Sequence, residues 1–419
     1  MALPNPFEWL RDHSSGPCTY ASNDATRNRH GSPTILNQPS RHTAEVTLRA
    51  AVRSEWLYDL TLLVGTRVAL FAVGLVALQL LPIGPRHLDL LPHLPALDMW
   101  AQWDAQHYVN IAVRGYDPPT APESNIAFFP LYPLLIRVVL LALGRVDVQT
   151  GAFVGVVISN VALFGALLYL SGLVARDFSL SLARRTVLYV LVFPTTLFLS
   201  SVYAEPLFLV TAVASLYHAR AGEWGRSGVA GALAALTRPF GVLLFIPMAV
   251  ELYRQRARLR SWLALIGPPA GLAIFVGYLW WLFADPLAYL HAGTSWGRGL
   301  YAPWDVLLGY IHGPLQGFDW TYSSLDLISM IAMVGVLIVG IRRVPASYSS
   351  YTAAGLIFAM STGVAWFSAS RHALALFPVI IVLAVLGWRY RWFYWAWLAI
   401  SIVVAAGFMV REALGYWVT

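Results

Sequence analysis

Residues 60–82, LTLLVGTRVALFAVGLVALQLLP, show what class of protein this chain is. The run is apolar apart from Arg67, two threonines and one glutamine. As a helix its 23 residues would rise about 34 Å, which exceeds the roughly 30 Å hydrocarbon core of a bilayer. We therefore predict a membrane-spanning helix, in which the side chain of Arg67 snorkels to the inner membrane surface.

The composition extends this interpretation to the whole chain. Of its 419 residues, 58% are hydrophobic and 12% are charged, whereas a soluble domain carries about 25% charged residues. These values exclude a soluble enzyme and a disordered chain. All 28 basic residues are arginines in short loops between apolar runs, so the net charge of +7 indicates membrane orientation and not nucleic-acid binding. The single cysteine, Cys18, excludes an intramolecular disulfide.

The apolar runs predict an all-α polytopic membrane protein with about 10–11 membrane helices. Residues 228–250 are interrupted by Arg238-Pro239, and each half is too short to cross a bilayer alone, so we predict a broken or re-entrant hairpin there. Further spans are expected at 151–174, 186–203, 204–219, 263–283, 325–341, 352–366, 372–387 and 392–410.

The run 126–143 is the ambiguous segment. If it crossed the membrane together with 151–174, the arginines of the following loop would face outward, against the positive-inside rule. Pro130 and Pro133 also disfavour a straight span. We therefore predict an interfacial helix, and the other arginine-bearing loops then also face the cytoplasm.

This topology divides the chain into three regions. Residues 1–59 are predicted to form a cytoplasmic, largely disordered, arginine-rich tail. Residues 60–250 form a first membrane module, whose long first outer loop, 83–150, carries interfacial helices. Residues 251–419 form the C-terminal membrane helices with a second outer loop at 284–324.

Unusual polar residues fall at five places on the predicted outer face. The first is Trp103-Asp104 followed by His107-Tyr108, in which the i,i+4 spacing pairs Trp103 with His107 and Asp104 with Tyr108 on a short helix. A carboxylate between aromatic rings at a membrane surface suits a general base. The alternative is an aromatic interface belt in which Asp104 caps a helix.

The second and third places combine aromatic residues with proline. Phe128, Phe129 and Tyr132 form a rigid apolar ledge with two prolines, which suits a wall for a lipid chain or a plain interfacial helix start. Tyr203 and Glu205 precede Pro206 between two predicted spans. An acid at that depth indicates a site, and the alternative is a simple cap.

The fourth and fifth places are basic. Arg238 lies at the tip of the predicted hairpin, where an arginine requires an anionic partner. That partner is a substrate phosphate, or else Glu205 or Asp104 within the chain. Arg371-His372 opens the next predicted span, where a helix N-terminus favours anions, although an ordinary loop arginine fits the pattern as well.

Together these residues suit a lipid donor that carries a phosphate, combined with proton abstraction. No glycine-rich phosphate loop indicates a nucleotide site. A divalent metal remains possible, but the sequence does not support one, because Asp98 and Asp104 lie six residues apart and no HxxxH or DxD pattern occurs.

The same motifs, in this order from about residue 60 to 250, resemble the PIG-V type mannosyltransferases of the GT-C superfamily of membrane glycosyltransferases. Beyond them the resemblance is reduced to Arg371-His372 and Phe377-Pro378. It implies that 60–250 is a GT-C-like catalytic module, which moves a sugar from a polyprenyl-phosphate donor to a hydroxyl of a lipid or glycan acceptor with inversion. Transfer is expected on the extracytoplasmic side, in a bacterial plasma membrane, and mannose rests on the resemblance alone.

The resemblance and the five places assign expected roles. Asp104 is the expected base, and His107 its orienting or secondary group. The donor phosphate is expected at Arg238, Arg371 and His372. Glu205, Tyr203, Tyr108 and Trp103 are expected to contact the sugar or acceptor. Phe128, Phe129 and Tyr132 are expected to line the lipid groove. A secondary transporter or lipid flippase, a scaffold subunit and a GT-C enzyme for a different sugar are the alternatives.

Overall fold

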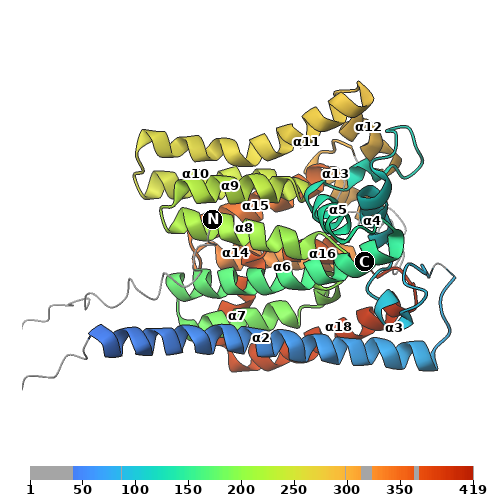
Figure 1. The fold of residues 1–419 in the computed structure, drawn as a ribbon. Helices are drawn as coiled ribbons and strands as arrows, with labels where there is room; N and C mark the ends of the chain where they lie inside the picture. Colours follow the sequence, from blue (N-terminus) through green and yellow to red (C-terminus); the bar gives the residue numbers. More distant parts are fainter. Residues whose placement is uncertain (1–40, 86, 298, 313–322, 363–367, 419) are drawn as a thin grey trace, which may run out of the picture.

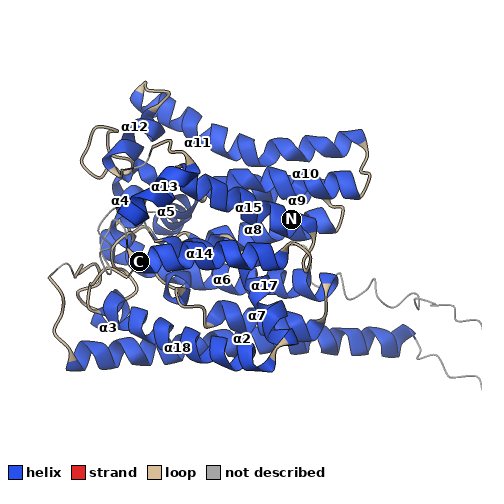
Figure 2. Cartoon of the chain, turned by 180° about the vertical axis from the view of Figure 1, so that it is seen from behind, coloured by secondary structure: helices blue, strands red, loops and turns tan. Residues whose placement is uncertain are grey.

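The computed structural model describes residues 41–85, 87–297, 299–312, 323–362 and 368–418, which form helices and contain no strand (Figures 1 and 2). The described elements are α2 Arg41–Leu80, α3 Pro95–Asp98, α4 Ala105–Arg114, η1 Asn125–Ala127, α5 Leu131–Leu143, α6 Val148–Asp177, α7 Leu180–Leu191, η2 Thr196–Leu199, α8 Glu205–Arg220, α9 Trp224–Ala235, η3 Pro239–Leu244, α10 Phe245–Arg254, η4 Leu259–Ile266, α11 Gly267–Phe283, α12 Ala288–Ser295, α13 Pro303–His312, α14 Ser324–Gly340, α15 Ala346–Ser361, α16 Ala369–Ala375, α17 Pro378–Arg389 and α18 Arg391–Ala413.

Long apolar helices make this chain an integral membrane protein. In the described part, four helical segments are long and apolar enough to cross a bilayer: Glu55–Leu80, Val148–Asp177, Leu259–Phe283 and Arg391–Ala413. A fifth is added if α16 and α17 are counted as one bent span. The all-helical membrane bundle is as predicted, and the other described helices are shorter than 18 residues.

The segment 126–143 does not form a span. Its helix α5 has 13 residues, too few to cross a bilayer. Figure 1 shows α5 nearly end-on at one end of the bundle, whereas α6 and α8 run lengthwise. This agrees with the predicted interfacial helix.

The interruption predicted at Arg238-Pro239 is present. Helix α9 ends at Ala235 and the 3-10 helix η3 begins at Pro239, after which α10 turns back along the bundle (Figure 1). A Cβ atom on Gly241 would lie 2.2 Å from the backbone carbon of Ala234, so only glycine fits where the two arms of the hairpin meet.

Three predicted segments differ. The span expected at 186–203 is a 12-residue helix, α7, that ends at Leu191 and is followed by a turn and η2. The span expected at 372–387 is two helices bent by 87°. In the tail, α2 already begins at Arg41, so the predicted disorder does not extend over 41–59, and residues 1–40 lie outside the described residues.

Arg67 explains the break after α7 and corrects the prediction that it snorkels. Its guanidinium donates to the carbonyl oxygens of Leu191, at 2.9 Å, and Thr196, at 3.0 Å, and also to the Thr196 and Ser200 hydroxyls. Carbonyls released where a helix breaks at membrane depth need such a donor. Proline at position 194 prevents the helix from continuing.

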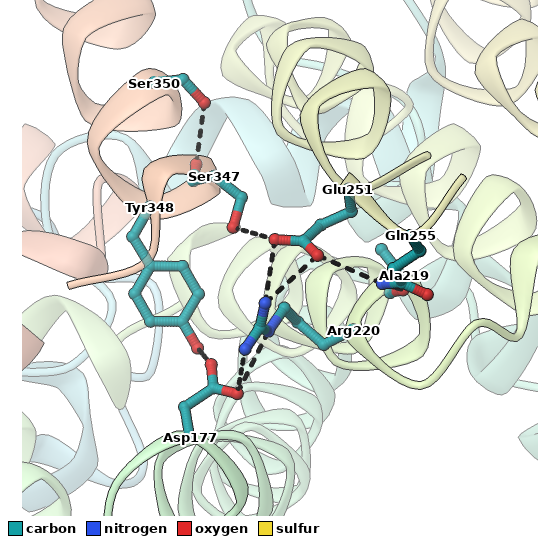
Figure 3. Close-up of polar contacts among 8 residues, drawn as sticks. All are labelled: Asp177, Ala219, Arg220, Glu251, Gln255, Ser347, Tyr348 and Ser350. Carbon is teal, nitrogen blue, oxygen red and sulfur yellow. Dashed lines mark hydrogen bonds and ion pairs between the residues drawn. The ribbon is translucent and has the colours of Figure 1, made fainter. Parts of the chain in front are cut away.

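The end of the bundle away from α4 and α5 is held by a buried ionic network (Figure 3). Arg220 of α8 contacts Asp177 of α6, at 2.7 Å, and Glu251 of α10, at 3.1 Å. Ser347 and Tyr348 of α15 donate hydrogen bonds to Glu251 and Asp177. Removing one member would leave a buried charge unpaired, at a cost of roughly 3–5 kcal/mol. The network therefore ties four helices together at the end of the bundle opposite the pocket.

Candidate functional site

A pocket opens at the end of the bundle that carries α4, α5 and α16, on the right in Figure 1. The empty space in and at the mouth of the pocket amounts to about 870 Å³ and includes open solvent. Its walls come from segments more than 300 residues apart in the sequence. They are formed by Asp104, Tyr108, Ala127, Phe128, Phe129, Thr237, Arg238, Pro239, Phe240, Trp296, Ser368, Arg371, His372 and Trp417.

The pocket unites four of the five places singled out in the sequence. Asp104 and Tyr108, Phe128 and Phe129, Arg238, and the pair Arg371-His372 all line it. The remaining place, around Glu205, lies directly behind the arginines. The convergence predicted from topology is therefore present, whereas the chemical roles stay predictions.

Asp104 occupies the N-cap position of α4, but its side chain makes no capping hydrogen bond. Instead its Oδ2 accepts from Nη1 of Arg371 at 2.8 Å. Trp103 has a positive φ of 54° and precedes the helix, so the expected helical pairing of Trp103 with His107 does not form. Trp103 packs edge-on against Trp417, with ring centroids 5.1 Å apart.

Glu205 joins both predicted phosphate-binding arginines. It begins α8, is 3% exposed, and its Oε1 contacts Arg238 and the Nε of Arg371. Arg371 thus bridges Asp104 and Glu205. The intramolecular pairing considered for Arg238 is present, so the resting cluster contains two acids and two arginines and is close to neutral.

Aromatic rings fix the plane of the Arg371 guanidinium. Its central carbon lies 4.9 Å from the ring centroid of Phe198 and 4.7 Å from that of Tyr203. The Tyr203 hydroxyl donates to the backbone oxygen of Gln102 at 3.2 Å, and the side chain is buried behind Arg371. Tyr203 therefore supports the arginine and is not among the residues that line the pocket, and its expected contact with sugar or acceptor stays a prediction.

The apolar wall of the pocket is built around Phe128. The ring of His107 stacks on Phe128 at 4.6 Å and meets Trp296 edge-on at 5.4 Å. Burial lowers the pKa of His107 below its usual value, and the Asp104 carboxylate opposes this shift. His107 packs against Phe128 and is not among the residues that line the pocket, and its expected role beside Asp104 stays a prediction.

Tyr132 also lies away from the pocket. It is fully buried, and its hydroxyl contacts the Gly155 carbonyl, at 2.9 Å, and the Ser159 hydroxyl, at 2.8 Å. Tyr132 is therefore a core residue that joins α5 to α6, and the lipid-groove role predicted for it stays a prediction.

A second, mostly apolar groove adjoins the pocket between α4, α5 and α11. The pocket and the groove share a partition, in which the Leu131 backbone N–H donates to the Leu236 carbonyl at 3.0 Å. Pro130 and Pro133 of the predicted ledge contribute to this groove. Its residues are Ile111, Arg114, Gly115, Tyr116, Pro130, Leu131, Pro133, Leu134, Arg137, Leu236, Ile274, Phe275 and Tyr278.

Four residues at the site escaped the sequence analysis. Trp296 and Trp417 line the pocket, Asp326 binds the backbone at the start of α16, and Glu412 is completely buried at the end of α18, within electrostatic reach of Asp104. The tryptophans resemble ordinary interfacial residues, and the acids sit at ends of apolar runs. The only available signal was an acid at membrane depth. Among the described residues, no cluster of three or more His, Cys, Asp or Glu side chains could hold a metal ion.

Comparison with protein families adds an independent finding. The family described as Mannosyltransferase (PIG-V) matches residues 95–254. Over these residues the chain resembles the PIG-V mannosyltransferases. The matched part contains Asp104, Phe128, Glu205 and Arg238, and it supports a membrane glycosyltransferase of the mannosyltransferase class, as the motifs predicted. No curated protein matches the chain.

Solved structures give a more distant likeness. The chain is similar to the apo form of the Archaeoglobus fulgidus oligosaccharyltransferase, with 14% identity and a TM-score of 0.43 over 86% of this chain and 56% of that one. The same enzyme in complex with Zn and sulfate gives 12% identity and a TM-score of 0.38 over 83% and 53%. The chain thus spans little more than half the length of these structures.

Proposed function

We propose that this protein transfers a sugar from a polyprenyl-phosphate-sugar donor to a hydroxyl of a lipid or glycan acceptor, with inversion, on the extracytoplasmic side of a bacterial plasma membrane. The family resemblance favours mannose as the sugar. The observation that carries the proposal is the cluster of Asp104, Glu205, Arg238 and Arg371 at the pocket, next to an apolar groove.

The orientation follows from the charges. Arg184 lies near the start of α7 and Arg220 ends α8, and these helix ends lie opposite the pocket (Figure 1). The positive-inside rule favours such arginine-bearing helix ends in the cytoplasm. The pocket then opens on the other side of the membrane.

The two arginines suit the donor phosphate. A guanidinium presents five N–H donors in a planar fork, so Arg371 can grip a phosphate while it keeps Glu205. As the bond between the anomeric carbon and the phosphate oxygen breaks, the oxygen leaves with the bonding electrons. Arg238 and Arg371 then stabilise the added negative charge, which is the kind of electrostatic effect that often contributes most to catalysis.

Asp104 is the proposed general base. It is partly exposed to the pocket, and a donor phosphate would compete with its carboxylate for Arg371. A carboxylate oxygen released in this way accepts the acceptor's hydroxyl proton while the acceptor oxygen attacks the anomeric carbon. Attack from the face opposite the leaving phosphate inverts the configuration.

The adjoining groove suits the donor's prenyl chain. Leu134 and Ile274 on its walls are 55% and 60% exposed. The groove and the pocket lie on either side of the partition of Leu131 and Leu236, so a prenyl chain in the groove would lie next to the pocket that Arg238 lines.

The test is sugar transfer by membranes that contain the protein, supplied with a panel of radiolabelled polyprenyl-phosphate sugars and a native lipid extract as acceptor. Membranes without the protein provide the background. Label that moves from one donor only when the protein is present identifies the activity and the sugar. Folded protein that moves label from none of the donors contradicts the proposal.

A further inference from the structure

The position of Arg371 depends on a short helix with an unusual beginning. Helix α16 has seven residues and is bent by 87° from α17. Ser368, which precedes it, has a backbone φ of 58°, in the left-handed region that residues other than glycine rarely adopt. A helix of about two turns with such an entry has little stability of its own, so contacts from other elements must hold it.

An acid from another helix supplies that contact. Asp326 lies in the first turn of α14 and is 2% exposed, and its Oδ1 accepts the Ala369 backbone N–H at 2.7 Å. The backbone N–H groups of Ser370 and Ser368 also face this carboxylate. These are the amides that a helix start leaves without intrahelical partners.

The chemistry of this contact is strong and directional. A carboxyl oxygen accepts these backbone N–H groups in either protonation state, and in the ionised state the hydrogen bonds are charge-assisted and roughly twice as strong as neutral ones. In the same part of α16, the Ser370 carbonyl accepts a long hydrogen bond, at 3.4 Å, from the Thr195 hydroxyl. Asp326 therefore holds the backbone at the start of α16, in addition to the ion pairs that Arg371 itself makes with Asp104 and Glu205.

Helix α16 carries the residues that form the polar wall of the pocket. Two residues beyond Ala369, Arg371 contacts both Asp104 and Glu205, and its neighbour His372 also lines the pocket. A shift of this turn by about 1 Å would misplace the guanidinium relative to a bound phosphate, and misplacements of that size cost roughly a hundredfold in rate.

We propose that Asp326 is a positioning residue for the donor phosphate: it holds the amide end of α16 and thereby sets Arg371 in the pocket. This inference rests on the proposed function, since it assumes that Arg371 binds the phosphate. Asp326 itself does not line the pocket, so it acts only through the helix that it caps.

Three variants test this inference. Asp326→Ala removes the contact, and Asp326→Asn keeps the side-chain volume and one oxygen acceptor. Met330→Ala is the matched control, because Met330 lies one turn further along α14 and is also 2% exposed. We expect Asp326→Ala to raise the KM for the donor at least tenfold, Asp326→Asn to raise it less, and Met330→Ala to leave it within twofold. A donor KM that is unchanged in Asp326→Ala overturns the inference.

Amide hydrogen exchange separates this inference from the proposed function. Exchange at Ala369 and Ser370 should be faster in both Asp326 variants than in wild type, whether or not any sugar is transferred. Faster exchange with no activity in the wild type would leave the capping role intact and contradict the proposed function. Unchanged exchange at these amides would contradict the capping role itself, even in an active enzyme.

Combining Asp326→Ala with Arg371→Lys gives a further check. If Asp326 acts through Arg371, the two losses in kcat/KM should not add, because the second change acts on an interaction already lost. Fully additive losses would show that Asp326 acts by another route and would overturn the inference.

Discussion

Replacing Arg371 by lysine separates charge from shape at the centre of the pocket. The guanidinium reaches Asp104 from one nitrogen and Glu205 from another, and it stacks on Phe198 and Tyr203. An ammonium group keeps the charge, but it lacks the planar fork and the stacking surface. We expect the substituted lysine to hold one of the two acids and to grip a phosphate poorly.

The size of the loss follows from these contacts. One hydrogen bond to a charged group contributes about 1.5–3 kcal/mol, and a desolvated cation–π contact about 2 kcal/mol. The remaining ammonium contact offsets part of this, which leaves a net loss of about 2–3 kcal/mol in transition-state stabilisation. Since 1.36 kcal/mol corresponds to a factor of ten, kcat/KM should fall roughly 30- to 150-fold.

The assay is kcat/KM for the donor with purified wild type, Arg371→Lys and the control Arg343→Lys. Arg343 is exposed and lies beyond the end of α14, outside the pocket. The control should stay within twofold of wild type. A loss of less than threefold in folded Arg371→Lys would refute the proposal that the fork of Arg371 binds the phosphate.

Three further predictions concern the groove, the break after α7 and pH. Ile274→Trp should fill the groove and slow transfer from long-chain donors more than from short-chain donors. The control Ile331→Trp, at a site of similar exposure on α14, should not change the rates with either donor. Equal effects of Ile274→Trp on both donors would argue against the groove. Arg67→Leu leaves two backbone carbonyls without their donor, at about 1–3 kcal/mol, and should lower the thermal unfolding temperature in detergent, with an unchanged temperature as the contrary result. Because burial lowers the pKa of His107, the unfolded chain binds its proton more readily, so stability should fall as pH drops below the ordinary value of 6.5. His107→Phe should lose less stability than wild type between pH 7.5 and 5.5, and identical losses would contradict this.

The fold class and the hairpin could be predicted because each has a strong local signal. Long apolar runs indicate membrane helices, and Arg238-Pro239 at membrane depth interrupts one of them visibly. The span expected at 186–203 was wrong for a physical reason. An apolar run also suits a buried irregular segment, provided that a distant donor such as Arg67 satisfies its carbonyls.

Part of the site was predictable because charged side chains are energetically costly at membrane depth and are therefore rare there. Acids and arginines at membrane depth stand out, and Asp104, Glu205, Arg238 and Arg371 do meet. Aromatic residues carry no such signal, so the sequence could not separate Phe128, which lines the pocket, from the neighbouring core residues. Tyr132 and Tyr203 are buried in the core of the bundle. Asp326 and Trp417 depend on contacts between distant helices, which a single sequence does not reveal.

The general base at Asp104 is best tested with purified protein in liposomes, using the active donor and a lipid acceptor extract. Asp104→Asn is compared with wild type and with Asp117→Asn, an exposed acid of the same loop that does not line the pocket. We predict that Asp104→Asn loses at least a hundredfold in kcat, since general-base catalysis contributes about 10²–10⁴, while Asp117→Asn stays near wild type. A folded Asp104→Asn variant that transfers sugar at the wild-type rate would contradict the account and move the base to another acid, with Glu205 the first to examine.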